Sequence, residues 1–190
     1  MKNSFLLVSA IALLGFVSCG EDDGNAAGCP DGFEGDNCAE QVNTKFIGTY
    51  DVEMYGQLSG SVSGLASITL DAGTEASPKT ATAVITQGAE DGPDEVRINV
   101  TLPLTATGDL NSDFTIPVEI VGEVRNSTEY YIPQTSIGFA FNVPVPVIGG
   151  ISASANLSFG IDGVFQGDTL VSTLNGGGDF AGTIVMKGLR

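Results

Sequence analysis

The sequence predicts an all-β domain over residues 44–190, built as a single antiparallel β-barrel or as a β-sandwich with about 8–10 strands. Apolar and polar residues alternate in several long runs, which is typical of strands with one buried face. Clusters of Gly, Asn, Asp and Pro separate these runs, as expected of turns. After residue 18, no stretch of a dozen residues has the apolar spacing of a helix.

The strongest strand signals are runs in which every second residue is apolar: residues 96–106, 114–120, 137–147 and 151–161. Residues 50–54, 81–85 and 180–186 show the same alternation over shorter lengths. Successive side chains of a strand point to opposite faces. The apolar half of each run is therefore expected to form the core.

Turn signals separate the runs at residues 71–73, 88–94, 108–113, 149–150, 166–168 and 175–179. Their spacing is that of hairpins joined in chain order, which predicts a meander. Proline cannot donate a hydrogen bond to a ladder. The prolines in or beside the runs are expected to mark edges, bends or bulges; they are Pro103, Pro117, Pro133, Pro144 and Pro146.

Two closures fit these strands. A barrel leaves no free edge and can enclose a pocket, whereas a sandwich accommodates proline-bearing edges more easily. The residues Gly48-Thr49-Tyr50 resemble the G-x-W/Y motif that opens lipocalin-type barrels, and this favours the barrel. A membrane-spanning barrel is not favoured, because the runs lack aromatic girdles and the sequence ends in Gly188-Leu189-Arg190.

The first residues have the three-part layout of a secretory signal. Lys2 precedes an apolar run, FLLVSAIALLGFV, that ends at Val17 and is followed by Ser18 and Cys19. The run has about 13 residues, fewer than the roughly 20 that span a bilayer as a helix. Residues 1–18 are therefore predicted to be removed, either by a cut that leaves Cys19 as a free thiol or by processing as a lipoprotein.

Phe16-Val17-Ser18-Cys19 resembles a bacterial lipobox, which implies that Cys19 is acylated and becomes the first residue of the mature chain. Two or more acyl chains suffice for stable membrane anchoring. Residues 19–28 then form an acidic, glycine-rich tether that is too polar to fold. The acidic run Glu21-Asp22-Asp23 is similar to the export signal of surface lipoproteins in the Bacteroidota, which implies a location on the cell surface.

Residues 29–38, CPDGFEGDNC, resemble the last loop of an EGF-like module, C-x-x-G-F-x-G-x-x-C. The resemblance implies a disulfide between Cys29 and Cys38, which suits an oxidising compartment. It implies nothing about receptor binding, because a full EGF module needs more cysteines than this chain has. A zinc site is the rival interpretation, but the chain has no histidine, and acylation of Cys19 would leave no third thiolate.

The order of these segments is similar to a recurrent layout among Bacteroidota lipoproteins. A lipobox, an acidic stretch and a G-F-E-G-x-x-C loop are followed by a K-F-x-G-x-Y segment at residues 45–50. In those proteins this segment opens a β-rich, lipocalin-like domain whose function is poorly defined. The resemblance implies the same domain order here.

Composition excludes two classes of function. The chain has 7 Lys and Arg against 23 Asp and Glu, a net charge of −16 at pH 7. Nucleic acid is excluded as a partner, because phosphate binding needs a basic surface. The chain has no histidine, the commonest acid–base group at neutral pH, and no G-x-S-x-G nucleophile motif. An enzyme is therefore not predicted, and neither a catalytic residue nor a cofactor is assigned.

Other candidate sites carry weaker signals. The acidic loops at residues 31–36 and 90–95 lack the ligand spacing of an EF-hand, so no metal site is predicted. Carbohydrate binding would need an exposed aromatic platform, for which the candidates are Tyr50, Tyr55, Tyr130 and Tyr131. Asp168-Thr169-Leu170 resembles the O-glycosylation site of the Bacteroidota, with Thr169 as the modified residue.

The sequence thus predicts an outer-membrane, surface-exposed lipoprotein anchored through Cys19. Its role is predicted to be non-catalytic: binding, or service as an accessory subunit beside an outer-membrane protein partner. The alternatives are a lipocalin-like carrier of a small apolar ligand and a carbohydrate-binding or adhesive β domain.

Overall fold

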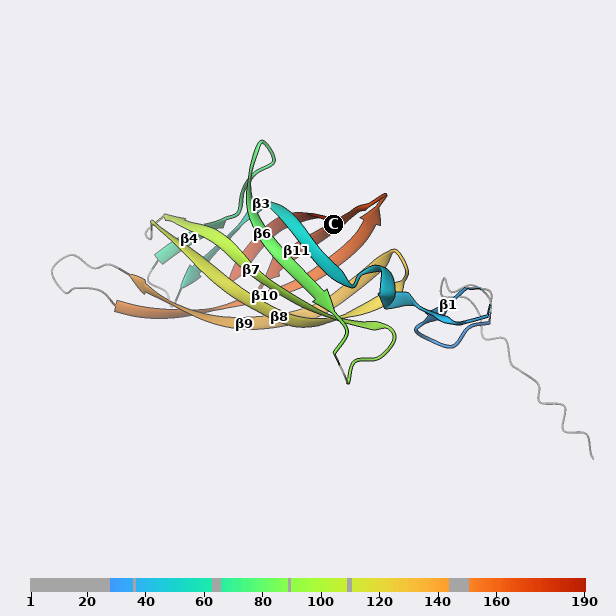
Figure 1. Cartoon of the computed structure of the whole chain (residues 1–190). Coiled ribbons are helices and arrows are strands. Elements are labelled where there is room, and N and C mark those ends of the chain that lie inside the picture. Colours follow the sequence, from blue (N-terminus) through green and yellow to red (C-terminus); the bar gives the residue numbers. More distant parts are fainter. Residues whose placement is uncertain (1–27, 36, 63–65, 89, 109–110, 144–150) are drawn as a thin grey trace, which may run out of the picture.

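The alternating runs close into an antiparallel barrel of eight strand positions (Figure 1). This computed structural model describes residues 28–35, 37–62, 66–88, 90–108, 111–143 and 151–190. The predicted signal sequence and lipidation site at Cys19 lie outside these residues. Among the described residues, no helix combines the length and the apolar character needed to cross a bilayer.

The strands of the barrel follow one another in a meander. Their bounds are β3 Gly48–Val62, β4 Ala66–Asp71, β5 Gly73–Thr74, β6 Ser77–Thr86, β7 Glu95–Gly108, β8 Ser112–Asn126, β9 Glu129–Val143, β10 Ile151–Gln166, β11 Thr169–Gly177 and β12 Phe180–Leu189. β12 pairs with β3 from Phe180–Gly60 to Leu189–Asp51, which closes the circle. The predicted barrel is confirmed, and the alternative of a sandwich is wrong, because a sandwich would leave these two strands as edges.

β4 and β6 share a single position in the wall. Both pair with β3 on one side and with β7 on the other, β4 through residues 66–71 and β6 through residues 79–86. Between them the chain makes a short excursion that includes β5 and projects from the barrel (Figure 1). The wall is therefore interrupted at this point, and β7 has no partner on that side between its two pairings.

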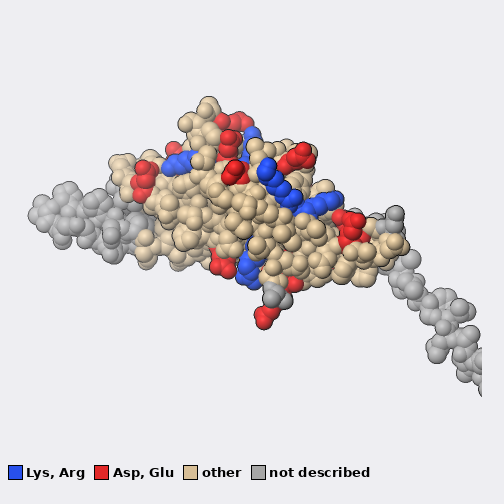
Figure 2. All heavy atoms as spheres, in the orientation of Figure 1, with Lys and Arg blue, Asp and Glu red and all other residues tan. Residues whose placement is uncertain are grey.

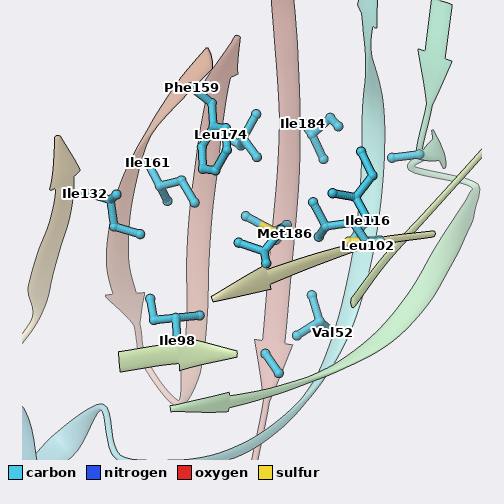
Figure 3. Packing of buried hydrophobic residues seen from close by; sticks show 14 of the residues in the cluster. Val52, Ile98, Leu102, Ile116, Ile132, Phe159, Ile161, Leu174, Ile184 and Met186 are labelled. Carbon is cyan, nitrogen blue, oxygen red and sulfur yellow. The ribbon is translucent and has the colours of Figure 1, made fainter. Parts of the chain in front are cut away.

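The core fills the barrel interior with the apolar half of each alternating run. Figure 3 shows side chains from different strands pointing toward one another, among them Val52, Ile98, Phe159, Leu174 and Met186. All five are buried. At roughly 1.5–3 kcal/mol for each large apolar side chain removed from water, this burial is the main force that holds the barrel together.

One end of the barrel is plugged by the segment that leads into it. A 3-10 helix, η1 (Val42–Lys45), precedes Phe46, whose ring has no exposed surface and packs against Tyr130 and Phe165. Asn43 is also fully buried and donates a hydrogen bond to the carbonyl of Glu95 at 2.9 Å. This end of the core is therefore closed by side chains of the segment that precedes β3.

The small N-terminal loop lies outside the same end of the barrel (Figure 1). Its strands β1 (Phe33–Glu34) and β2 (Glu40–Gln41) form a two-stranded sheet, and a disulfide joins Cys29 to Cys38, as predicted. The amide of Val42 donates to the carbonyl of Gly32 at 3.1 Å. The loop is thus attached directly to the plug.

The wall has one long gap, which we call the β8–β9 opening. In the described part of the chain, β8 pairs with β9 only between residues 123–126 and 129–131. Residues 112–122 of β8 and 132–143 of β9 pair only with their other neighbours, β7 and β10. The opening begins where the β9–β10 ladder shifts register, with Pro133 and Gln134 opposite Gly160 alone.

The prolines lie where backbone donors have no partner. Pro103 falls in the part of β7 between its pairings with β6 and β4. Pro117 and Pro133 lie on the two strands that border the β8–β9 opening. A missing N–H costs no ladder bond at such places, so the expectation that prolines mark edges or bulges is confirmed for these residues. Pro144 and Pro146 lie outside the described residues.

Candidate ligand cavity

The barrel interior contains a cavity that the core side chains leave unfilled. It leaves about 40 Å³ for the centres of water-sized molecules, enough for about three waters or for one small organic group. Its lining comes from all eight strand positions of the wall. The lining residues are Tyr50, Val52, Ala83, Ile85, Ile98, Val100, Leu102, Val118, Ile120, Tyr130, Phe159, Ile161, Leu170, Ser172, Leu174, Met186 and Gly188.

The lining is apolar and uncharged. Among these residues only Tyr50, Tyr130 and Ser172 carry a polar side-chain atom other than sulfur. A cavity lined in this way does not attract water strongly and accepts apolar molecules in its place. It does not accept a charged group, because no side chain in the lining can neutralise a buried charge.

Tyr130 and Ser172 form the polar pair of the cavity. The Tyr130 hydroxyl donates to Ser172 Oγ at 2.8 Å, and both residues are buried. The Tyr130 ring lies flat on Gly163, where a Cβ would come within 1.8 Å of a ring carbon. Any side chain at position 163 would displace the ring, so the orientation of the hydroxyl depends on this glycine.

Burial raises the pKa of Tyr130 to about 12, while its hydrogen bond with Ser172 opposes the increase. The neutral phenol is thus strongly preferred inside the barrel. At neutral pH the pair consists of two uncharged hydroxyls. Each hydroxyl oxygen also retains a lone pair that can accept a hydrogen bond from a ligand.

Tyr50 closes the cavity toward the plug. Its hydroxyl donates to the carbonyl of Phe46 at 2.8 Å, and its ring lies 5.1 Å below the Arg190 guanidinium. Arg190 also donates to the carbonyls of Lys45 and Ile47, the latter at 2.7 Å. Burial raises the pKa of Tyr50, and the Arg190 charge lowers it. These contacts occupy the Tyr50 hydroxyl, so Tyr130 and Ser172 are the groups left for a ligand.

We expect Tyr130→Phe to flatten the loss of stability in alkali. A phenol with a raised folded-state pKa binds its proton more tightly in the folded than in the unfolded protein. The stabilisation that comes from this tighter proton binding is complete below pH 10 and is lost as the pH rises through about 12. The free energy of unfolding changes by about 2–3 kcal/mol over this range. The free energy of unfolding, measured by denaturant titration between pH 9 and pH 12, should fall more steeply for the wild type than for the variant. Parallel curves would show that Tyr130 ionises as freely in the folded state as in the unfolded one.

The opposite side of the cavity is less well covered. Val100 and Ile120 face the interior but are only half-buried. Ile120 lies on β8, beside the β8–β9 opening. Farther along this opening, the rings of Phe114 and Phe139 stack at 5.9 Å between centroids. The half-buried part of the cavity lining therefore lies on β7 and β8.

Among the described residues, the outer surface carries a more open and more polar hollow, lined by Thr82, Asn99, Val100, Thr101, Pro117, Val118 and Glu119. Acidic and basic side chains are interspersed on the face seen in Figure 2. Tyr55 and Tyr131 lie on the outside but are covered by Lys187 at 5.1 Å and Arg125 at 4.6 Å. The two other tyrosines proposed as a carbohydrate platform, Tyr50 and Tyr130, are buried. The described tyrosines therefore do not gather into an exposed aromatic platform.

The acidic loop between β6 and β7 is tied down by its own contacts. Asp91 pairs with Arg97 at 3.0 Å and accepts from the amide of Gly88, and Glu95 accepts from the amide of Gly92 at 2.7 Å. In the part of the chain that the structure describes, no group of three Asp, Glu, Cys or His side chains is placed to hold a metal ion. The carboxylates of this loop serve as turn acceptors.

Of the modification sites predicted from the sequence, those among the described residues do not line the cavity. Thr169 is the first residue of β11, half-buried beside the exposed turn at Gly167 and Asp168. Its glycosylation stays a prediction. Cys29 and Cys38 lie outside the plugged end, and Cys19 lies outside the described residues.

Sequence reasoning missed Ser172 and left Tyr130 ambiguous. Tyr130 and Tyr131 are adjacent, so the alternation of a strand places one inside and one outside without saying which. A signal for Ser172 does exist in the run Leu170, Ser172, Leu174, where a serine occupies an inward position between two leucines. A polar residue at a core position of a strand deserves to be considered as a candidate ligand contact.

Comparison with protein-family models, with curated proteins and with solved structures finds no match to this chain.

Proposed function

We propose that this protein is a lipid-anchored, non-catalytic binding protein of the outer membrane, whose barrel holds a small, neutral, largely apolar molecule. The observation that carries the proposal is the uncharged cavity with the Tyr130–Ser172 pair on its wall. The ligand has an apolar body and one neutral hydrogen-bonding group, such as a hydroxyl. A carboxylate is disfavoured, because the lining offers no cation to compensate for its lost hydration.

A binding role fits this lining better than catalysis. The only hydroxyl groups in the lining belong to Tyr50, Tyr130 and Ser172. Neither Tyr130 nor Ser172 has a base beside it in the lining, and a serine needs an adjacent base to act as a nucleophile. The raised pKa of Tyr130 also keeps its proton in place near neutral pH. This set of groups is suited to orienting a ligand.

Membrane anchoring is proposed from the sequence, through acylation of Cys19. We expect Cys19→Ser to lose labelling by a palmitate analogue and to move from the membrane pellet to the soluble fraction, because the acyl chains supply the binding energy for the bilayer. Cys29→Ser with Cys38→Ser is the control, and this double variant should keep the label. A Cys19→Ser protein that stays in the pellet would argue for a different anchor.

The ligand class is tested with three molecules of similar size: toluene, benzyl alcohol and benzoate. At about five times its Kd, a ligand stabilises the protein by about 1 kcal/mol, or about 3 °C in Tm. We expect toluene and benzyl alcohol to raise Tm and benzoate to leave it unchanged. Equal shifts with benzyl alcohol and benzoate would mean that binding occurs outside the uncharged cavity.

A cavity-filling variant tests whether the ligand binds inside the barrel. Ala83 lines the cavity, and its neighbour Thr82 is exposed on the outer face. Ala83→Leu adds methyl groups to the cavity and should weaken benzyl alcohol binding at least tenfold, which corresponds to about 1.4 kcal/mol. Thr82→Leu adds similar bulk outside and should bind as the wild type does. Equal binding by the two variants, measured by ligand-detected NMR, would contradict the proposed site.

A further inference from the structure

The β8–β9 opening extends the apolar lining of the cavity to the surface. Val118 and Ile120 line the cavity from β8, the strand that borders the opening. The partly buried apolar residues that pack on the core include four from its two sides: Phe114 and Ile120 of β8, and Ile137 and Phe139 of β9. These four side chains line the β8–β9 opening, and Ile120 belongs to the cavity lining as well.

The β8–β9 opening borders a stretch of chain without charge. From Tyr130 to Ile161 the sequence contains no Asp, Glu, Lys or Arg, although the whole chain is strongly acidic. This stretch includes β9 and most of β10. An apolar chain lying beside β9 therefore desolvates no charged side chain of that strand, which removes the largest cost of burial there.

The gap is part of the fold. Pro117 on β8 and Pro133 on β9 cannot donate to a ladder, and the bulge at Pro133 and Gln134 coincides with the point where β9 leaves β8. Bulges of this kind terminate pairing and redirect a strand. The sequence thus holds the two strands apart beside the half-buried Ile120 and Ile137.

From this geometry we infer that the ligand is a neutral single-chain amphiphile that is longer than the cavity. This inference rests on the proposed function. The hydroxyl end of the ligand binds at Tyr130 and Ser172. Its alkyl chain leaves the cavity over Ile120, runs along the β8–β9 opening past Ile137, and replaces the water that covers these side chains. Ile120 lines the cavity and also borders the β8–β9 opening, and this is the reason for assigning both to one molecule.

The test is a series of straight-chain alcohols, from butanol to dodecanol, titrated into the full chain in competition with benzyl alcohol. Each methylene that enters an apolar site is expected to lower Kd about fourfold. If the alkyl chain lies along the β8–β9 opening, this gain in affinity continues through dodecanol. If the cavity alone takes it, Kd stops falling once the cavity is full, at about hexanol, and the inference is overturned.

The failure of the inference differs from a failure of the proposed function. In the first case benzyl alcohol and butanol bind but the longer alcohols gain nothing. In the second case none of these molecules binds. Dodecanoate tests the direction of the chain, because a carboxylate cannot enter beside Tyr130 and Ser172. Binding of dodecanoate as tight as that of dodecanol would mean that the tail enters first, and would overturn the assignment of the polar end.

Ile137→Gln tests whether the alkyl chain lies along the β8–β9 opening, and it leaves the cavity lining unchanged. Ile137 is half-buried in the opening and does not line the cavity. The variant should bind butanol as the wild type does and lose most of the gain from octanol to dodecanol. Val84→Gln is the matched control, since Val84 is 38% exposed on the outer face of β6. Identical alcohol series for the two variants would overturn the placement of the chain.

Discussion

Gly182→Ala is expected to lower the free energy of unfolding by about 2–5 kcal/mol and Tm by about 10 °C. Gly182 has a φ of 135° in β12, a conformation that residues with a side chain rarely adopt. A Cβ at this position would lie 2.2 Å from the carbonyl oxygen of Gln57 in β3. The carbonyl oxygen belongs to the backbone of the β3–β12 ladder, and the backbone of β12 fixes the position of the Cβ, so rotating a side chain cannot relieve the clash.

Gly138→Ala is the matched control for this effect. Gly138 is also a strand residue, but a Cβ there would meet only Asn156 Oδ1, at 3.3 Å. Because that side chain is exposed and can move, the change should stay within about 0.5 kcal/mol. Chemical denaturation of both variants measures the difference. Equal stabilities would mean that the β3–β12 ladder has room for a side chain at Gly182.

Phe46→Ala is expected to cost about 3–5 kcal/mol, the usual loss for removing a buried aromatic ring. The ring is fully buried and packs on Phe165 at 5.0 Å and edge-on to Tyr130 at 5.7 Å. Its removal leaves a void beneath Tyr50 and Tyr130, which line the cavity. We therefore also expect the variant to bind naphthalenemethanol, a neutral alcohol larger than benzyl alcohol, more tightly than the wild type does.

Phe46→Leu shows whether the effects of Phe46→Ala come from the lost ring volume or from a change in the backbone of the plug. Leucine keeps most of the buried volume and leaves intact the backbone carbonyl that accepts from Tyr50. It should lose about 1–1.5 kcal/mol and bind naphthalenemethanol no better than the wild type does. If Phe46→Ala gained no affinity for the larger alcohol, the plug would not adjoin the cavity.

The strands that carry strict alternation could be predicted from the sequence. Residues 96–106, 114–120 and 151–161 lie within β7, β8 and β10. In each of these strands one face meets the core, so the pattern of burial is written directly in the order of residues. The barrel was also favoured correctly, through the resemblance of Gly48-Thr49-Tyr50 to the start of lipocalin-type barrels.

Elements that depend on tertiary pairing could not be predicted from local patterns. Residues 175–179, with three glycines in the middle, have the composition of a turn, yet Asn175 to Gly177 form the end of β11 because they pair with β10. β4 was missed because its alternation is short. The β8–β9 opening has only an indirect signal, the prolines, since a missing ladder concerns two strands and no single segment records it.

The same limit applies to the cavity. Its lining residues are ordinary inward positions of strands, and alternation cannot distinguish an inward side chain that fills space from one that borders a void. The pairing of Tyr130 with Ser172 joins residues on strands β9 and β11, which are not neighbours in the sheet. Gly163 of the intervening strand β10 pairs with both residues, and its missing side chain lets the Tyr130 ring reach across to Ser172.

The closing ladder also determines when the barrel can form during synthesis. Among the strands of the barrel, β3 is made first and β12 last, and each lacks one neighbour until the other is made. Contacts between such distant residues form late and slowly. A chain made at about 5–20 residues per second therefore stays open until Phe180–Leu189 is complete. If the protein is exported as proposed, this delay keeps the chain open for crossing the membrane until β12 is made.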